Sequence, residues 1–106
     1  MLSDEYRYKI LRLLEDDPRM SQRELARALD ISLGKANYCL QALIEKGFIK
    51  AQNFKNSQNK KAYLYLLTRR GFSAKASATV SFLQRRMAEY EALRREIKML
   101  KREVSR

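Results

Sequence analysis

A long stretch without helix breakers at the end of the chain constrains the fold most. No proline follows Thr68, and Gly71 is the only glycine beyond it. Thr68 can cap a helix, and the apolar spacing predicts that one helix runs from there to about Val104. At 1.5 Å per residue such a helix is about 54 Å long, too long to pack along a body made of residues 1–67. Part of it must therefore find another surface for its apolar side chains.

Apolar residues of this helix repeat in heptads, the pattern of a coiled coil. Among the seam positions from 72 to 104 only Thr79 and Arg86 are polar, and the seam is cleanest after Tyr90. We therefore predict a homodimer formed by this helix. Its interface residues are predicted to be Phe72, Leu83, Tyr90, Leu93, Ile97, Leu100 and Val104.

Charged residues beside the seam favour parallel pairing. Glu89 would face Arg94 of the partner subunit, and antiparallel pairing would instead oppose like charges. Glu96 would face Lys101 of the partner subunit in the same way. Exposed pairs contribute little energy, so these charges select the orientation without holding the dimer together. The alternative is a monomer whose helix breaks near residues 78–79 and folds back.

Residues 1–67 carry the start and stop signals of three helices. The first is expected over residues 4–15, with Ser3 as its cap. The second begins at SQRE, where Ser21 and Glu24 form a capping box. Asp30 suits a left-handed turn, and the third helix then runs from a Ser32 cap to the closing Gly47.

The apolar pattern becomes strand-like after this third helix. Residues 48–54 and 62–67 are two β-prone runs joined by the polar, basic sequence KNSQNKK. One helix, a helix-turn-helix and a β-hairpin, in this order, make a winged helix. The predicted fold is mainly α with a small β-hairpin. A winged helix-turn-helix domain occupies residues 1–67, and a long C-terminal dimerisation helix, a coiled coil, occupies residues 68–106.

Positive charge dominates the middle of the chain. The net charge is +11, and no Asp or Glu lies between Lys46 and Arg86. A stretch with many basic and no acidic residues favours an anionic partner. Nucleic acid is the first candidate, and an anionic membrane surface is the second. We expect no membrane association, because several acids lie on outer faces of the last helix and no apolar run is long enough to span a bilayer. The acidic start of the chain does not resemble an export signal.

The outer face predicted for the third helix is polar and almost uncharged. In a helix-turn-helix, the N-terminal part of the second helix reads base edges in the major groove. Asn and Gln bond adenine, Lys reaches guanine or phosphate, and Tyr reaches phosphate or a thymine methyl. The predicted base-reading residues are Ser32, Gly34, Lys35, Asn37, Tyr38 and Gln41. The alternative is a face that only contacts water, which leaves the adjoining basic stretch unexplained.

The hairpin tip and the second helix supply candidates for contacts with the DNA backbone. A winged-helix tip follows the phosphates or enters a minor groove, where cations are attracted. The predicted backbone and wing residues are Arg23, Lys55, Asn56, Gln58, Lys60 and Lys61. For any one lysine, a solvated loop position is an equally good interpretation.

The composition argues against an enzyme. The chain has no histidine and a single cysteine, Cys39, which excludes His/Cys metal sites and histidine-based catalytic relays. The three glycines are isolated, so no phosphate-binding loop exists. We predict no catalytic residues, no metal and no cofactor. A lone cysteine that cannot form an internal disulfide is typical of the reducing cytosol.

Three segments of the sequence resemble MarR-type winged-helix transcriptional regulators. The first two are SQRELARALDISLGKANYCLQALIEKGFIK and AYLYLLTRRG. The ending FLQRRMAEYEALRREIKMLKREV is similar, more narrowly, to a small exopolysaccharide-associated subgroup. The resemblance implies a bacterial, cytoplasmic homodimer that binds a pseudo-palindromic operator in double-stranded DNA. It also implies a link to exopolysaccharide genes.

Two functions from different classes therefore compete. The first is a dimeric, sequence-specific regulator of transcription. The alternative is a winged-helix module that binds another protein through its C-terminal helix. The sequence identifies no small-molecule effector for either.

Overall fold

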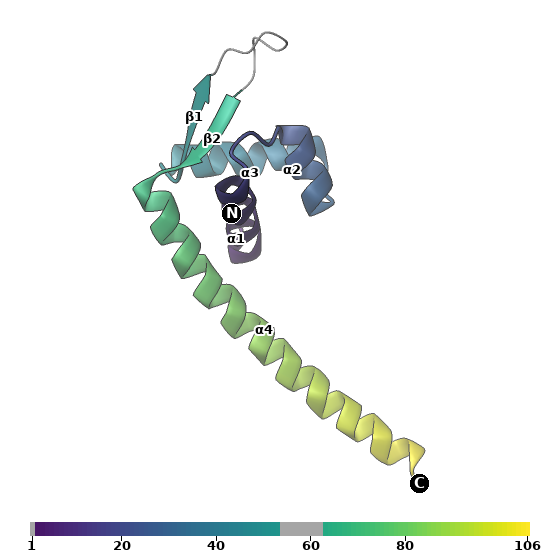
Figure 1. Ribbon diagram of the computed structural model, residues 1–106. Coiled ribbons are helices and arrows are strands. Elements are labelled where there is room, and N and C mark those ends of the chain that lie inside the picture. Colours follow the sequence, from purple (N-terminus) through teal and green to yellow (C-terminus); the bar gives the residue numbers. More distant parts are fainter. Residues whose placement is uncertain (1, 54–62) are drawn as a thin grey trace.

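The computed structural model describes residues 2–53 and 63–106, and its elements have the predicted order (Figure 1). Helices α1, α2 and α3 are followed by two strands, β1 and β2, and by the long helix α4. Their bounds are α1 Asp4–Asp16, α2 Gln22–Leu29, α3 Leu33–Glu45, β1 Ile49–Asn53, β2 Tyr63–Leu67 and α4 Arg69–Val104. The predicted fold, a mainly helical winged helix-turn-helix with a small hairpin and a long C-terminal helix, is confirmed.

Each of the four helices begins at a hydroxyl side chain that accepts a backbone N–H. The caps are Ser3, Ser21, Ser32 and Thr68. At α2 the capping box is complete: the Ser21 hydroxyl oxygen lies 3.1 Å from the Glu24 amide nitrogen, and a Glu24 carboxylate oxygen lies 3.1 Å from the Ser21 amide nitrogen. Such caps satisfy amide groups that a helix start otherwise leaves without partners.

Two residues with positive φ end the helices of the helix-turn-helix motif. Asp30, at the end of α2, has a φ of 54° and a ψ of 51°, and Gly47, after α3, has a φ of 77°. Both were predicted from the sequence. An acidic residue tolerates the left-handed region better than most side chains, so the turn forms without glycine.

The core lies where α1, α2, α3 and the hairpin meet. Its fully buried side chains are Ile10, Leu11, Leu14, Leu25, Leu40, Leu43 and Ile49. Ile44 of α3 is half-buried, whereas Cys39 of the same helix lies in the core. Cys39 falls on the same helical face as Ala36 and Leu40, and its small thiol fits there.

The hairpin is antiparallel, with Ile49 opposite Leu67 and Asn53 opposite Tyr63. It is joined to the helical part by a backbone hydrogen bond in which the Tyr65 amide donates to the Pro18 carbonyl at 2.9 Å. The Thr68 amide donates to the Phe48 carbonyl at 3.1 Å, which extends the pairing of the hairpin by one residue on each side. Phe54 and Ala62, which we predicted to be strand residues, lie outside the described residues.

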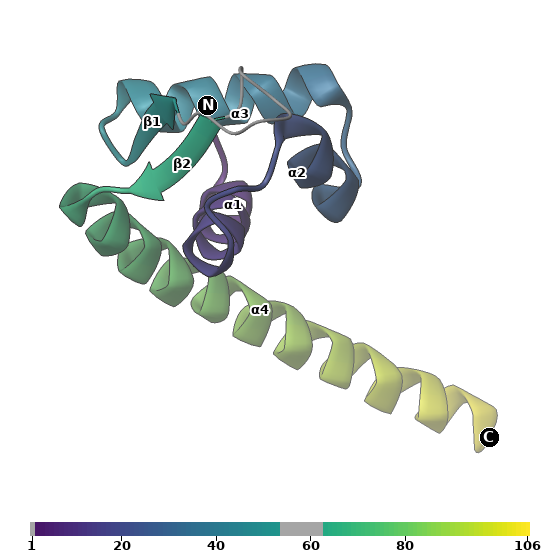
Figure 2. The ribbon, with the colours of Figure 1, turned by 45° about the horizontal axis from the view of Figure 1, so that its top comes forward.

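Helix α4 is continuous, so the alternative of a break near residues 78–79 is wrong. It lies on the side of α1 opposite to α3 (Figure 2). Its first half packs along α1, and its second half extends away from the rest of the molecule. The molecule is therefore elongated, with extents of 69 × 27 × 23 Å. None of the helices in the described residues is both long and apolar enough to cross a membrane.

Candidate nucleic-acid interface

The six predicted base-reading residues lie together on the outer face of α3 and of its cap. Ser32, Gly34, Lys35, Asn37, Tyr38 and Gln41 are all exposed, whereas Ala36, Cys39, Leu40 and Leu43 of the same helix are buried. Tyr38 is 61% exposed although it is aromatic. The only acid in α3, Glu45, is its last residue. The first turns of α3 thus offer polar groups to a partner without repelling an anion.

Lys35 makes a contact that sequence reasoning missed. Its Nζ donates to the Tyr6 hydroxyl at 3.3 Å and lies 4.7 Å from the centre of the Tyr6 ring. The two residues are 29 positions apart, so no local pattern could have found this pair. The contact holds Lys35 toward the start of α1 and extends the basic, polar edge of α3 onto that helix.

Cys39 lies on the inner side of the same helix. Burial raises the pKa of the Cys39 thiol, and the positive charge of Lys35 offsets part of this increase. A buried, protonated thiol is a packing residue with low reactivity.

The predicted backbone contacts are only partly described. Arg23 lies in the first turn of α2 and is exposed. Lys55, Asn56, Gln58, Lys60 and Lys61 lie outside the described residues. The strands that lead to them, β1 and β2, form the base of the wing.

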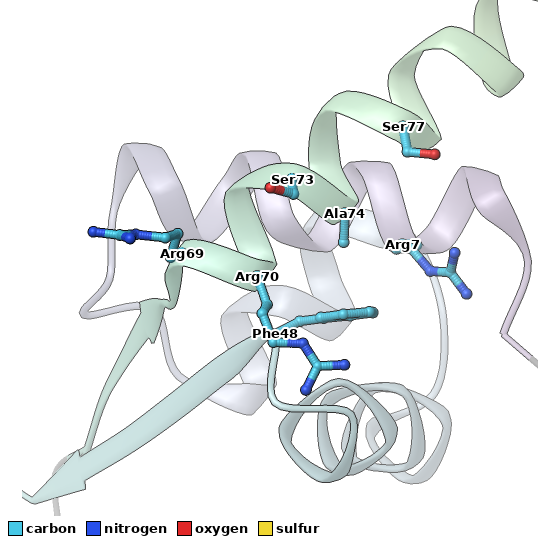
Figure 3. Close-up of a pocket in the computed structure, with 7 residues that line it drawn as sticks. All are labelled: Arg7, Phe48, Arg69, Arg70, Ser73, Ala74 and Ser77. Carbon is cyan, nitrogen blue, oxygen red and sulfur yellow. The ribbon is translucent and has the colours of Figure 1, made fainter.

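A basic depression of about 500 Å³ lies at the junction of α1, the turn after α3 and the start of α4 (Figure 3). The guanidinium carbons of Arg7 and Arg70 lie 5.9 Å and 5.8 Å from the centre of the Phe48 ring, while Arg69 points away from it. Both Arg7 and Arg70 are thus held by the aromatic ring. None of the predicted base-reading residues lines this depression, which lies between the winged domain and the start of α4.

The predicted dimer residues of α4 form an uncovered apolar surface. Phe72 and Leu83 are 50% and 58% exposed, and the later members, Tyr90, Leu93, Ile97, Leu100 and Val104, range from 44% to 86%. Val80, Met87 and Met99 are also more than half exposed. Among the described residues nothing packs on this surface. So large an uncovered apolar stripe is typical of an interaction site.

Comparison with known proteins agrees with this architecture. Residues 3–50 match the family model described as winged helix-turn-helix DNA-binding. A search of curated proteins gives no significant match.

Solved structures of similar fold include several regulators. They include an adhesin competence repressor from Streptococcus pyogenes, at 18% identity and a TM-score of 0.64, over 94% of this chain and 75% of that one. A MarR transcriptional regulator from Methanosarcina mazei Go1 has 20% identity and a TM-score of 0.66. The match covers 88% of this chain and 68% of that one. A MarR/EmrR family regulator from Acinetobacter sp. ADP1 has 20% identity and a TM-score of 0.60. The match covers 93% of this chain and 74% of that one.

At these identities the structural likeness establishes the fold. The match over residues 3–50 includes all three helices of the winged domain and the whole outer face of α3. Residues 3–50 are therefore similar to the winged helix-turn-helix DNA-binding family, and the chain shares its fold with MarR-type transcriptional regulators.

Proposed function

We propose that this protein is a MarR-type transcriptional regulator that binds double-stranded DNA sequence-specifically as a homodimer. The observation that supports this best is the outer face of α3, where Asn37, Tyr38 and Gln41 are exposed side by side. Their amides and hydroxyl have no hydrogen-bond partner among the described residues, so they are available to base edges.

In this proposal the start of α3 enters the major groove. Asn37 and Gln41 are one helical turn apart and bond adenine edges, while Lys35 reaches a guanine or a phosphate. Gly34 and Ser32 allow the backbone to approach the groove closely. Tyr38 contacts a phosphate or a thymine methyl.

Contacts to the DNA backbone are assigned to Arg23 and to the wing. Arg23 is exposed at the start of α2, where it can reach a phosphate beside the groove. The wing residues Lys55, Asn56, Gln58, Lys60 and Lys61 follow the backbone or enter the adjacent minor groove. Such contacts position the protein without reading sequence.

The dimer is assigned to residues 68–106, and the DNA-binding unit to residues 1–67. Two α4 helices pair in parallel through the seam that ends in Leu93, Ile97, Leu100 and Val104. In the single chain, Glu89 lies 3.1 Å from Arg86 and Arg94 lies 3.9 Å from Glu91, both within α4. Pairing exchanges these weak contacts for Glu89–Arg94 and Glu96–Lys101 contacts between chains.

The similarity of the α4 sequence to the exopolysaccharide-associated subgroup supports a role in controlling exopolysaccharide genes of a bacterium. It also supports action in the cytoplasm on a pseudo-palindromic operator. A symmetric dimer with two α3 helices fits an operator with two half-sites about one helical turn apart.

A binding experiment tests the proposal directly. The protein is titrated against fluorescent duplexes, one from the region upstream of its own gene and one with the same bases shuffled, at several salt concentrations. We expect about 10³-fold or tighter binding to a duplex that holds the operator, with a steep salt dependence. If both duplexes bind equally, sites are selected from random DNA. Failure of that selection to enrich any sequence would rule out specific recognition and favour the protein-binding alternative.

A further inference from the structure

Three ion pairs join α1 to the first half of α4, at both ends of α1. At its start, Asp4 lies 3.3 Å from Arg85 and Glu5 lies 3.0 Å from Arg86. At its other end, Glu15 pairs with Lys75. All the acids are on α1 and all the bases are on α4, and the two helices run in opposite directions. We call these three pairs the α1–α4 clamp.

The contact between the two ends of the clamp is closely packed. Ala78 of α4 is 2% exposed, and the rings of Tyr8 and Phe82 meet edge to face with their centres 5.5 Å apart. Arg86 also covers the Phe82 ring at 4.9 Å. This contact is close to the middle of α1, so it resists a pivot of one helix on the other less than contacts at the two ends of α1 do. The start of α4 is held separately, where Gly71 meets the Phe48 backbone.

The ion pairs act where such a pivot would produce the largest displacement. Asp4 and Glu15 are 11 positions apart in α1, which is about 16 Å along the helix. Any change in the crossing angle, or any sliding of α1 along α4, pulls at least one end of the clamp apart. A slide by one turn would also bring α1 acids opposite residues that are not their partners.

We infer that the α1–α4 clamp fixes the angle of the DNA-binding domain on α4 and thereby sets the distance between the two α3 helices of the dimer. Asp4, Glu5, Glu15, Lys75, Arg85 and Arg86 are positioning residues for operator spacing. The inference depends on the proposed function, because it requires a dimer formed by α4. None of the six residues belongs to the face of α3 that we assign to base reading.

The distance between two spin labels, one on each subunit of the dimer, tests this inference without DNA. Arg27 of α2 is exposed, so Arg27→Cys in a Cys39→Ala background carries one label on each DNA-binding domain. Double electron–electron resonance then gives the distribution of distances between the two domains. We expect one narrow distribution for the otherwise unchanged protein.

Lys75→Glu places a second acid beside Glu15 and should broaden the distribution about twofold, because like charges at this distance repel. Arg85→Glu, which faces Asp4, should do the same from the other end. The exchange Glu15→Lys with Lys75→Glu restores the attraction and should restore the narrow distribution. Lys is also favourable at position 15, in the last turn of α1, so this exchange preserves the helix.

Two variants with the same charge changes serve as controls. Asp16→Lys alters the neighbour of Glu15, and Lys98→Glu alters an exposed base in the second half of α4. Neither residue forms an ion pair among the described residues, so neither should broaden the distribution. Circular dichroism establishes that every variant is folded.

The results separate the inference from the proposed function. If the unchanged protein gives no distance between subunits, there is no dimer, and both are wrong. If the dimer forms but Lys75→Glu leaves the distribution narrow, or the charge exchange fails to restore it, the clamp does not set the spacing. Once an operator is known, the same variants are compared on duplexes with one base pair added or removed between half-sites. The Lys75→Glu variant should lose most of the discrimination, and the charge exchange should recover it.

Discussion

Gly71 lies directly against the backbone of Phe48. A Cβ at position 71 would lie 2.0 Å from the Phe48 carbonyl oxygen, which already accepts the Thr68 amide at 3.1 Å. The Thr68 hydroxyl donates to the Gly47 carbonyl at 2.5 Å beside it. Glycine is required here for close approach and not for an unusual φ, because Gly47 is the only glycine with positive φ. The start of α4 is therefore attached to the turn that follows α3.

Replacing Gly71 with Ala should destabilise the protein considerably. The added methyl group meets backbone atoms that cannot move aside, so we expect a loss of about 2 kcal/mol or more in the free energy of unfolding. For a domain of this size that lowers the melting temperature by roughly 10 °C, measured by circular dichroism. A variant as stable as the unchanged protein would show that α4 can begin further from Phe48.

Replacing Gly34 with Ala should stabilise the protein, in contrast to the same replacement at Gly71. Nothing lies within 4 Å of a Cβ at this position, and Gly34 is in the first turn of α3. Gly34→Ala should raise the free energy of unfolding by up to about 1 kcal/mol, because alanine favours the helix. It should also weaken operator binding, because its methyl group stands where the helix approaches the groove. Stabilisation without any loss of DNA affinity would place the groove contact elsewhere on α3.

Asn37→Ala combined with Gln41→Ala tests which side chains read the bases. Each good base contact is worth about 1–3 kcal/mol of discrimination, so the double variant should lose most of its preference for operator over shuffled DNA. Its nonspecific binding and salt dependence should stay the same, because no charge is changed. The variant Arg23→Ala is the matched comparison, since it should weaken binding to both duplexes alike. Unchanged discrimination in the double variant would contradict the assignment of α3.

Ile97→Asp should dissociate the dimer. Ile97 lies in the middle of the cleanest part of the seam, and a carboxylate there would have to be buried without a partner. We expect sedimentation as a monomer at concentrations where the unchanged protein is a dimer, together with weaker operator binding. Lys98→Asp, one position along and outside the seam, should leave the dimer intact. A dimer that survives Ile97→Asp would have its interface on another surface.

The Cys39 thiol predicts a loss of stability at alkaline pH. Burial raises its pKa above the ordinary value of 9.0, so the folded protein keeps this proton at a pH where the unfolded chain releases it. Its stabilising contribution is complete below pH 9 and decreases as the pH rises above it. The measurement is the difference in the free energy of unfolding between the unchanged protein and Cys39→Ala, from urea unfolding at pH 7.5 and pH 10. This difference should shrink at the higher pH.

Local signals explain which parts of the fold were predictable. The capping box of Ser21 and Glu24, the left-handed Asp30 and the closing Gly47 each act within four residues, so their sequence spacing defines their structure. A long C-terminal helix was predictable for the same reason, because no proline follows Thr68.

Contacts between distant residues account for what the sequence did not reveal. From the sequence alone, Gly71 could have been either a bend in α4 or a site of close packing, and only the position of Phe48 decides between them. The pairs Lys35–Tyr6 and Asp4–Arg85 join residues 29 and 81 positions apart. The outer face of α3 was predictable from helical periodicity, but its link to α1 was not.

The second half of α4 also bears on how the chain becomes fully folded. From Met87 to Val104 every residue is exposed, so this segment gains no stability from packing in its own chain. Isolated helices of this length are only marginally stable in water. In the proposed dimer, ordering of residues 87–104 and binding of a second copy are one event, which is governed by mass action. We expect residues 87–104 of newly made chains to stay frayed and protease-sensitive until the protein concentration is high enough for dimers to form. The lifetime of the protein should therefore increase with its concentration.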